Sequence, residues 1–379
     1  MALIARTITS LAEIAAADWN ALLRDGAGEL HPFARYEFLA ALETSGSVSE
    51  TQGWAPLHLL IEEDGALAGA APLYLKYHSQ GEYVFDHHWA DAFERAGGRY
   101  YPKLLCAVPF TPAAGPRLIA RTDAAKAALC EALKQIASQN SLSSAHVNFI
   151  QHEDEAALLR AGFDIRHGVQ YHWRNRNYAS FDEFLAALSS RKRKAIRRER
   201  RDALASGLMI TTMTGKEITL AHWDAFWIFY QDTGSRKWGH PYLTRAFFSE
   251  IAQTMPEQIM MVLAQRDGAP IAGALNFIAH DTLFGRYWGC TEHHPFLHFE
   301  VCYYRAIDFA IARGLARVEA GAQGEHKIAR GYEPVKTASA HWIAHPQFRD
   351  AIARYLEQER RSVSGDVEYL EDFTPFKNG

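Results

Sequence analysis

The sequence has 379 residues, of which 48% are hydrophobic and 22% charged, a balance typical of globular proteins. At the usual domain size this length predicts two domains, which we place at residues 1–170 and 171–379. The formal net charge of −4 argues against a protein that coats nucleic acid along its whole surface.

The same totals bear on the cellular compartment. The four cysteines form no CxxC pair, which favours a reducing compartment and argues against a disulfide framework. The first twenty residues lack the charged and apolar regions of a signal peptide. No apolar run is long enough to span a membrane, so we expect a cytoplasmic protein.

The first half of the chain is predicted to begin with two helices, at 11–24 and 34–43. Strands at 57–63 and 67–75 then flank the turn signal Asp64-Gly65. The remaining elements are the start of a third strand at 83–85, a loop-rich stretch over 86–117, a helix over 123–139, a strand over 146–150 and a short helix over 153–161.

The second half is predicted to start with one long helix over 181–206, which ends at Gly207. A second hairpin, of strands 259–267 and 270–279, surrounds Asp267-Gly268. The other predicted elements are strands at 208–213, 282–289, 316–321 and 339–344, and helices at 219–231, 298–313 and 346–361.

One internal repeat is visible. DGALAGA (64–70) matches DGAPIAGA (267–274) with one inserted residue, and each copy sits at a predicted hairpin turn. Asp-Gly turns are common, so a chance match is the alternative. Because a helix and then a strand follow both copies, two copies of one mixed α/β unit explain the pattern more economically.

Four segments carry a resemblance to a known family. They are residues 82–118, the Arg/Lys-rich run 189–201, residues 229–248 and residues 297–334. Together they resemble the bacterial FemAB-like predicted N-acyltransferases, which belong to the GNAT superfamily and are associated with peptidoglycan biosynthesis or recognition. The similarity extends over nearly the whole chain.

The resemblance implies an α/β (α+β) fold, namely a tandem GNAT-like acyltransferase fold with two mixed, mainly antiparallel sheets flanked by helices. It also implies transfer of an acyl or aminoacyl group to an amine. Some proteins of this architecture take the group from aminoacyl-tRNA and others from acyl-CoA. The Gly-rich pyrophosphate loop usual in GNAT proteins has no clear counterpart here, which weighs against acetyl-CoA as the donor. Acyl-CoA is kept as a candidate co-substrate, and no tightly bound cofactor is expected.

Amine acylation needs a group that accepts the amine proton and donors that stabilise the tetrahedral oxyanion. The Gly-punctuated loop EAGAQGEHKIARGYEP (319–334) offers both kinds of side chain after a predicted strand. A surface loop with solvated charges is the alternative. We predict five catalytic residues, the first near a helix start and the others on this loop: Glu300, Glu325, His326, Lys327 and Arg330.

Substrate contacts are predicted mainly from aromatic and polar residues in loops, a composition typical of pocket walls. The alternative is a folded loop whose Asp residues cap turns and whose Trp fills the core. The predicted substrate-binding residues are Asp86, His88, Trp89, Asp91, Lys103, Trp238, Arg286, Trp288 and Gln323. His293, His294 and His298 lack a convincing metal-ligand motif, so no metal site is predicted.

Residues 191–201 contain eight Lys or Arg and one Glu, within an otherwise acidic chain. A charge run is usually a solvated helix face. The functional alternative is contact with donor phosphates, a tRNA or anionic lipid headgroups. As phosphate-binding candidates we name Arg193, Lys194, Arg197 and Arg198.

Three functions remain open from the sequence. The first is an N-acyltransferase that uses a thioester donor, and the second is an aminoacyl-tRNA-dependent transferase that acts on a cell-wall precursor. The third is a non-catalytic protein that binds such a precursor or a lipid. Glu325 and His326 speak against the third, because a protein that only binds needs no acid or base in its site. The oligomeric state is not predicted.

Overall fold

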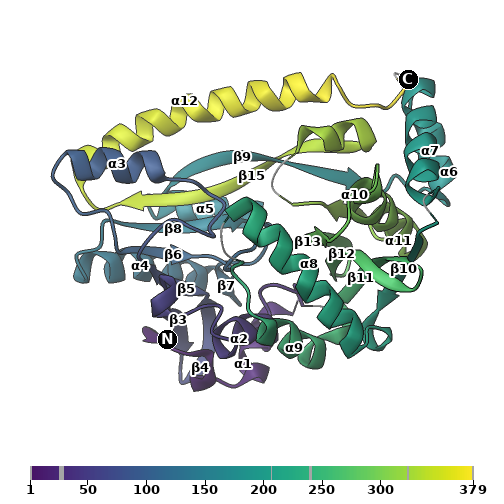
Figure 1. The fold of residues 1–379 in the computed structure, drawn as a ribbon. Coiled ribbons are helices and arrows are strands. Elements are labelled where there is room, and N and C mark those ends of the chain that lie inside the picture. The colour runs from purple at the N-terminus through teal and green to yellow at the C-terminus, as the bar shows by residue number, and fades with distance from the viewer. Residues whose placement is uncertain (1, 25–29, 206, 239–240, 322–323, 378–379) are drawn as a thin grey trace. The chain divides into compact units, whose positions relative to one another are not determined.

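The structure is a computed structural model that describes residues 2–24, 30–205, 207–238, 241–321 and 324–377. For residues 235–238 it describes the backbone alone. The chain divides into two compact units (Figure 1). Unit 1 comprises residues 1–168 and 336–366, and unit 2 comprises residues 169–335 and 367–379.

This division differs from the predicted one, which assigned all of 171–379 to the second domain. The difference arises at β15 (Tyr332–Ile343) and α12 (Pro346–Glu371), each of which passes from one unit into the other. Residues 338–343 of β15 pair with β8 of unit 1. On α12, Ile352 and Leu356 pack in one core with Trp89 and Tyr100. Residues far apart in sequence are therefore buried together.

Unit 1 contains two sets of strands with helices beside them. Its further elements are the strands β1 (Leu3–Ile8), β2 (Trp54–Pro56), β3 (His58–Glu63), β4 (Ala66–Ala71), β5 (Leu73–Lys76), β6 (Lys103–Cys106), β7 (Ile119–Ala120), β8 (Ser144–Ile150) and the start of β9 (Asp164–Arg174), and the helices η1 (Leu11–Glu13), α1 (Ala16–Leu23), α2 (Tyr36–Thr44), η2 (Glu50–Gln52), α3 (His87–Arg95), α4 (Asp123–Gln139) and α5 (His152–Arg160).

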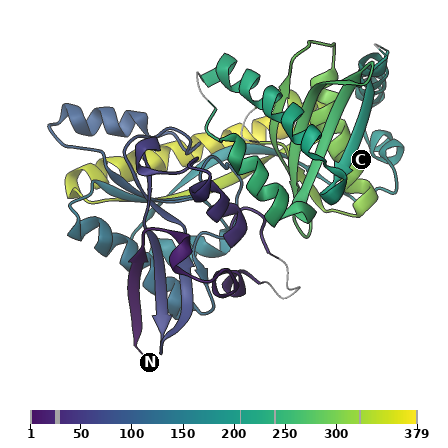
Figure 2. The ribbon, with the colours of Figure 1, turned by 60° about the horizontal axis from the view of Figure 1, so that its bottom comes forward.

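One set of strands in unit 1 is antiparallel, in the order β1-β3-β4-β7, and Figure 2 shows β1 as a purple arrow near the N-terminus. The other runs β15-β8-β6-β5-β2, in which β6 and β8 are parallel. Both sets contribute to one core, where Leu59 and Leu104 from strands meet Leu129 and Leu133 of α4.

Unit 2 contains a long hairpin, formed by β11 and β12. Its elements are the strands β10 (Met209–Thr214), β11 (Ile259–Arg266), β12 (Ala269–Ile278), β13 (Thr282–Cys290) and β14 (Arg317–Glu319), and the helices α6 (Phe181–Ala187), α7 (Ser190–Leu204), η3 (Gly215–Glu217), α8 (Leu220–Trp238), α9 (Arg245–Thr254), η4 (Pro256–Gln258), α10 (Leu297–Phe299), the π-helical turn η5 (Glu300–Tyr304), α11 (Arg305–Arg313) and η6 (Glu325–Arg330).

The strands of unit 2 form the order β10-β11-β12-β13-β14-β9. Pairing is antiparallel except between β13 and β14. Helix α8 packs along β12 and β13 (Figure 1). Two aromatic residues at helical spacing in this helix, Trp223 and Phe226, are buried.

The repeated Asp-Gly motif forms the same turn twice. Both turns are two-residue loops, since Glu63 pairs with Ala66 and Arg266 pairs with Ala269. The φ angles are 51° and 81° in the first turn and 52° and 80° in the second, the left-handed values that a type I′ turn requires. Each hairpin also has a register shift three residues before its Asp. These equivalent irregularities favour two copies of one unit over a chance match.

Three predicted elements are each split in the structure. The expected helix over 11–24 becomes η1 and α1, because Ile14 and Ala15 between them are extended. The expected helix over 181–206 is two helices, because Leu188 adopts an extended conformation and buries its side chain while it bridges Phe376. The expected strand over 67–75 breaks at Pro72, so that β4 pairs with β3 and β5 pairs with β6. Proline lacks the N–H that a continuous ladder would need there.

The structure also corrects the reading of residues 83–117. No strand forms at 83–85, where Tyr83 has a φ of 61° that does not fit a ladder. The loop-rich stretch over 86–117 contains helix α3 and strand β6. Four further strands, β1, β2, β7 and β9, had not been predicted.

Candidate active site

The parallel strands β13 and β14 pair over only three residue pairs, from Thr282–Arg317 to Phe284–Glu319. Beyond this point β13 continues to Cys290, whereas the chain after Glu319 leaves the sheet. The register of β13 against β12 also shifts here, so that Arg286 is the extra residue of a bulge. The two strands therefore separate where the loop toward η6 begins. The bulge at Arg286 also changes the direction of the β13 side chains that follow it.

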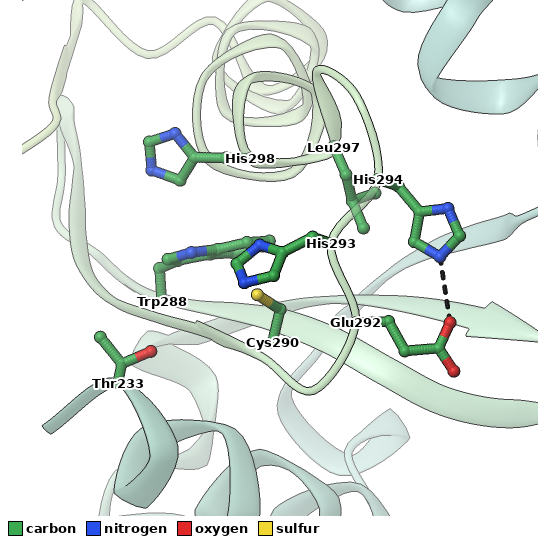
Figure 3. Close-up of a pocket in the computed structure, with 8 residues that line it drawn as sticks. All are labelled: Thr233, Trp288, Cys290, Glu292, His293, His294, Leu297 and His298. Carbon is green, nitrogen blue, oxygen red and sulfur yellow. Dashed lines mark hydrogen bonds and ion pairs between the residues drawn. The ribbon is translucent and has the colours of Figure 1, made fainter. Parts of the chain in front are cut away.

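A cavity of about 380 Å³ lies beside this end of β13 (Figure 3). Its walls come from β13, from α8 and from the segment that leads into α10. They are Thr233, Trp288, Cys290, Glu292, His293, His294, Leu297 and His298. In Figure 3 the imidazole of His294 turns toward Glu292, and its Nε2 lies 3.1 Å from the Glu292 Oε2. The predicted substrate residue Trp288 thus lines the cavity.

Gly289 allows α8 to approach the strand that forms this cavity. A Cβ at Gly289 would lie 2.0 Å from the carbonyl oxygen of Phe229, which is closer than any real contact. Only glycine fits between β13 and the α8 backbone at this position.

Aromatic and imidazole rings connect the cavity wall to η6. The Trp288 ring centroid lies 5.2 Å from that of His298, and His298 lies 5.2 Å from Tyr303. Phe299 packs against Tyr303 and, at 5.8 Å, against His326. These residues come from β13, α10, η5 and η6, so a continuous wall of rings runs from the cavity to the predicted catalytic loop.

His326 is exposed and has a buried phenol as its partner. Its Nε2 lies 2.9 Å from the Tyr303 hydroxyl oxygen. Partial burial of the ring, together with Arg330 and Lys327, lowers the pKa of His326 below its ordinary value. The imidazole is therefore neutral at neutral pH, and in the tautomer whose Nε2–H donates to the Tyr303 oxygen, Nδ1 is the basic nitrogen. Burial raises the pKa of Tyr303, so this phenol stays protonated.

Lys327 is buried beside this histidine. Its Nζ donates to the Gly321 carbonyl at 3.1 Å, and burial lowers the pKa of the ammonium to about 8. An amine with this pKa exchanges a proton near neutral pH, which an exposed lysine does not. Glu325, the neighbouring candidate, lies on the surface.

Arg330 is committed to contacts within the protein. Its Nη1 donates to the His326 carbonyl at 2.7 Å, and its Nη2 donates to Glu199 Oε1 at 2.9 Å. The guanidinium also stacks 3.4 Å from the ring centroid of Phe299. Glu199 additionally accepts a hydrogen bond from Tyr304. This arrangement indicates that Arg330 fixes the turn that carries His326.

Glu300 is similarly engaged. It is fully buried at the start of the π-helical turn and accepts from both Arg200 and Arg305, at 2.9–3.0 Å. Arg200 also reaches Asp308. Because two guanidinium groups donate to it, this carboxylate is poorly suited to take a proton from a substrate. Its ion pair with Arg200 instead links η5 to α7.

The four predicted phosphate-binding residues all lie on α7. Arg197 pairs with Asp182 and Arg198 with Asp202, both at the surface. Arg193 and Lys194 form no ion pair with any residue that the structure describes.

The predicted substrate residues of unit 1 fall into two groups. The Lys103 Nζ donates to Asp86 at 2.5 Å, to Glu82 at 2.8 Å and to Ser79 at 2.8 Å, all in the interior. Burial raises the pKa of Glu82 to about 7, whereas Lys103, acting against the effect of burial, holds the pKa of Asp86 well below its usual range. Asp86 and Lys103 therefore form a buried polar cluster.

The other three predicted residues of unit 1 lie on α3. Trp89 is buried and packs against His341, at 5.0 Å between ring centroids. His88 and Asp91 point to the solvent. The two remaining candidates, the Trp238 side chain and Gln323, lie outside the part of the chain that the structure describes.

Sequence reasoning missed a buried acid and its neighbour. Glu319 closes β14 opposite His172 of β9, and burial raises the pKa of Glu319 to about 7. The His172 Nε2 lies 3.8 Å from the Glu319 Oε2, and burial lowers the pKa of His172 to about 3. The available signal was a glutamate inside the predicted strand over 316–321. Tyr303 was also missed, because its helical spacing resembles that of core residues.

Comparison with known proteins now identifies the family. The profile of the FemAB-like family, described as peptidoglycan biosynthesis/recognition, matches residues 10–378. The chain belongs to the FemAB-like family. No curated protein matches the sequence of this FemAB-like chain significantly.

Solved structures share the fold of this FemAB-like protein at low sequence identity. FemX matches with 13% identity and a TM-score of 0.57, over 93% of this chain and 100% of FemX. L-PGS from Bacillus licheniformis matches with 11% identity and a TM-score of 0.51, over 86% of this chain and 98% of that one. A conserved protein from Bacteroides thetaiotaomicron matches with 11% identity and a TM-score of 0.53, over 89% and 99%. These matches confirm the predicted tandem GNAT-like α/β fold.

Two features are absent from the described residues. No described helix is long and apolar enough to cross a bilayer. Among the same residues, no group of three or more His, Cys, Asp or Glu is placed to hold a metal ion.

Proposed function

We propose that this FemAB-like protein is an N-acyltransferase that moves an acyl or aminoacyl group directly to an amine, at the site in unit 2. The observation that carries the proposal is a neutral, exposed His326 hydrogen-bonded to the buried Tyr303, beside a cavity walled by Trp288 and His298. The family description favours a cell-wall precursor as the acceptor.

In the proposed reaction the acceptor amine attacks the acyl carbonyl of the donor. The new C–N bond forms while the amine proton passes to His326, directly or through one water. The bond from the carbonyl carbon to the donor sulfur or oxygen then breaks, and the leaving group takes a proton. Lys327, with its pKa of about 8, is suited to supply that proton. The products are an amide and a free thiol or alcohol.

The cavity limits how much of the donor can be enclosed. A volume of about 380 Å³ is at the small end for a ligand site, so it suits the acyl end of a donor together with an amine. The remainder of an acyl-CoA or of an aminoacyl-tRNA would have to lie outside it. The cavity volume is therefore compatible with both acyl-CoA and aminoacyl-tRNA donors, and an experiment has to distinguish them.

Thermal unfolding of protein freed of nucleic acid makes that choice. The ligands are acetyl-CoA, a long-chain acyl-CoA and an aminoacyl-adenosine as a mimic of the tRNA end. A ligand at about 100 times its Kd stabilises the folded state by about 2.7 kcal/mol, a clear rise in Tm. The ligand class that raises Tm identifies the donor, and Trp288→Ala should reduce the rise. If none of the ligands raises Tm, the non-catalytic binding function replaces this proposal.

A further inference from the structure

One solvent face of α7 is a continuous cationic stripe. Arg191, Lys194, Arg198 and Arg201 stand at spacings of three, four and three residues, which places them on one side of a helix. All four are exposed, and the stripe is roughly 15 Å long at the helical rise per residue. The opposite face is docked in unit 2 through Ile196 and Ala203, both buried.

Little of this charge is neutralised within the protein. Arg198 and Arg201 share the single carboxylate of Asp202, and both arginine side chains are more than 70% exposed. Arg191 and Lys194 form no ion pair with any residue in the described ranges. The stripe thus keeps an excess of positive charge in a protein whose net charge is −4.

The stripe ends at exposed aliphatic side chains. Leu204, three residues after Arg201 on the same face, is 41% exposed, and Met209 shortly beyond it is 58% exposed. Phosphate backbones of nucleic acids offer nothing to a leucine or methionine, and single-stranded RNA sites use aromatic platforms. A lipid surface offers anionic headgroups to the cations and the acyl boundary to the aliphatic groups.

We infer that this face of α7 docks on an anionic lipid surface. The helix is anchored by its opposite face, so it presents Arg191, Lys194, Arg198 and Arg201 outward as a preformed row and puts Leu204 at its end. This inference is independent of the chemistry proposed above, since it concerns where the protein sits and not what it transfers.

Sedimentation with vesicles tests the inference on the full chain. The protein should sediment with vesicles of phosphatidylcholine and phosphatidylglycerol, and much less with phosphatidylcholine alone. Arg191→Gln with Lys194→Gln should weaken binding about 25-fold, at roughly fivefold for each cation removed. The matched control is Arg121→Gln with Arg160→Gln, two exposed arginines of unit 1, and it should change binding less than twofold.

Binding to a transfer RNA preparation separates the two anionic partners. Leu204→Ser should weaken vesicle binding and leave any RNA binding unchanged. Equal sedimentation with both vesicle types would overturn the inference, and so would tight RNA binding without vesicle binding. Circular dichroism and Tm of each variant show whether it is folded. The substituted cationic side chains are exposed, so their variants should have the values of the native protein. Leu204 is 41% exposed, so Leu204→Ser should lower Tm only slightly.

Discussion

The His326 Nε2 lies 2.9 Å from the Tyr303 hydroxyl oxygen, and this pair joins the π-helical turn η5 to the η6 loop. Glu199 of α7 holds both η5 and η6 in place, since it accepts hydrogen bonds from Tyr304 of η5 and from Arg330 of η6. A π-helical turn is rare and often marks a functional position, because it displaces side chains from their regular helical places. Here the turn carries the phenol that orients the proposed base.

The first prediction concerns the protonation of His326. Its pKa should lie below the ordinary histidine value, and Lys327→Gln should raise it, because a neighbouring cation is removed. The activity of a base with a lowered pKa is lost only as the pH falls through that lowered value. NMR titration of the imidazole measures the pKa without any substrate. An unchanged pKa in Lys327→Gln would mean that the two groups do not interact.

The second prediction concerns the anchor Glu300. Glu300→Gln removes the buried charge that Arg200 and Arg305 share, and should lower the free energy of unfolding. We expect a loss of about 2–4 kcal/mol in the free energy of unfolding. This is at or below the roughly 3–5 kcal/mol for a wholly buried pair, because both arginines reach the solvent. Glu357→Gln breaks the exposed pair with Arg361 and is the matched control, with an expected loss below about 0.5 kcal/mol. Urea unfolding compares the two, and equal losses would refute the anchor role.

The third prediction concerns the close approach of α8 and β13. Gly289→Ala should destabilise the protein by about 1–3 kcal/mol or more, because the added methyl group would overlap the Phe229 carbonyl. It should also reduce binding of any ligand in the adjoining cavity. Gly365→Ala on α12 meets nothing within 4 Å and should instead stabilise the helix by about 0.5–1 kcal/mol. Opposite signs in thermal unfolding are expected, and a stable Gly289→Ala would contradict the packing.

The fourth prediction is a pH dependence of stability from Glu82. Burial raises its pKa from 4.5 to about 7, so the folded protein holds a proton that the unfolded chain releases. The contribution of Glu82 is therefore full below pH 4.5 and is lost as the pH rises toward 7. Glu82→Gln cannot titrate, so the native protein should lose about 2–3 kcal/mol relative to this variant over that window. Urea unfolding of both proteins at several pH values measures the difference, and a constant difference would contradict the raised pKa.

Sequence patterns predicted the hairpins well because their turns are chemically specific. Asp64-Gly65 and Asp267-Gly268 can adopt the left-handed pair of conformations that a two-residue loop needs. The patterns failed where tertiary contacts override local preference. Leu188 lies within a helical pattern, yet its burial against the C-terminal segment breaks the helix.

The candidate site shows the same limits. The loop with His326 and Lys327 could be proposed from its composition, because glycines and titratable groups alternate there. Its supports could not, since Glu199, Tyr303 and Glu319 are distant in sequence and converge only in the fold. For the same reason the sequence did not distinguish Lys103, a buried ion-pair partner, from an open binding residue.

The proposed role of His326 is tested by measuring acyl transfer by the native protein and by His326→Gln, once thermal unfolding has identified the donor. Mass spectrometry follows transfer to amine acceptors, including a peptidoglycan precursor. Removing a general base should lower kcat by about 100- to 10,000-fold, whereas His152→Gln, whose side chain is 90% exposed, should leave it unchanged. Activity of the native protein, with the predicted loss in His326→Gln, would support acyl transfer with His326 as the base. Full activity of His326→Gln, or no transfer by the native protein with either donor class, would contradict it.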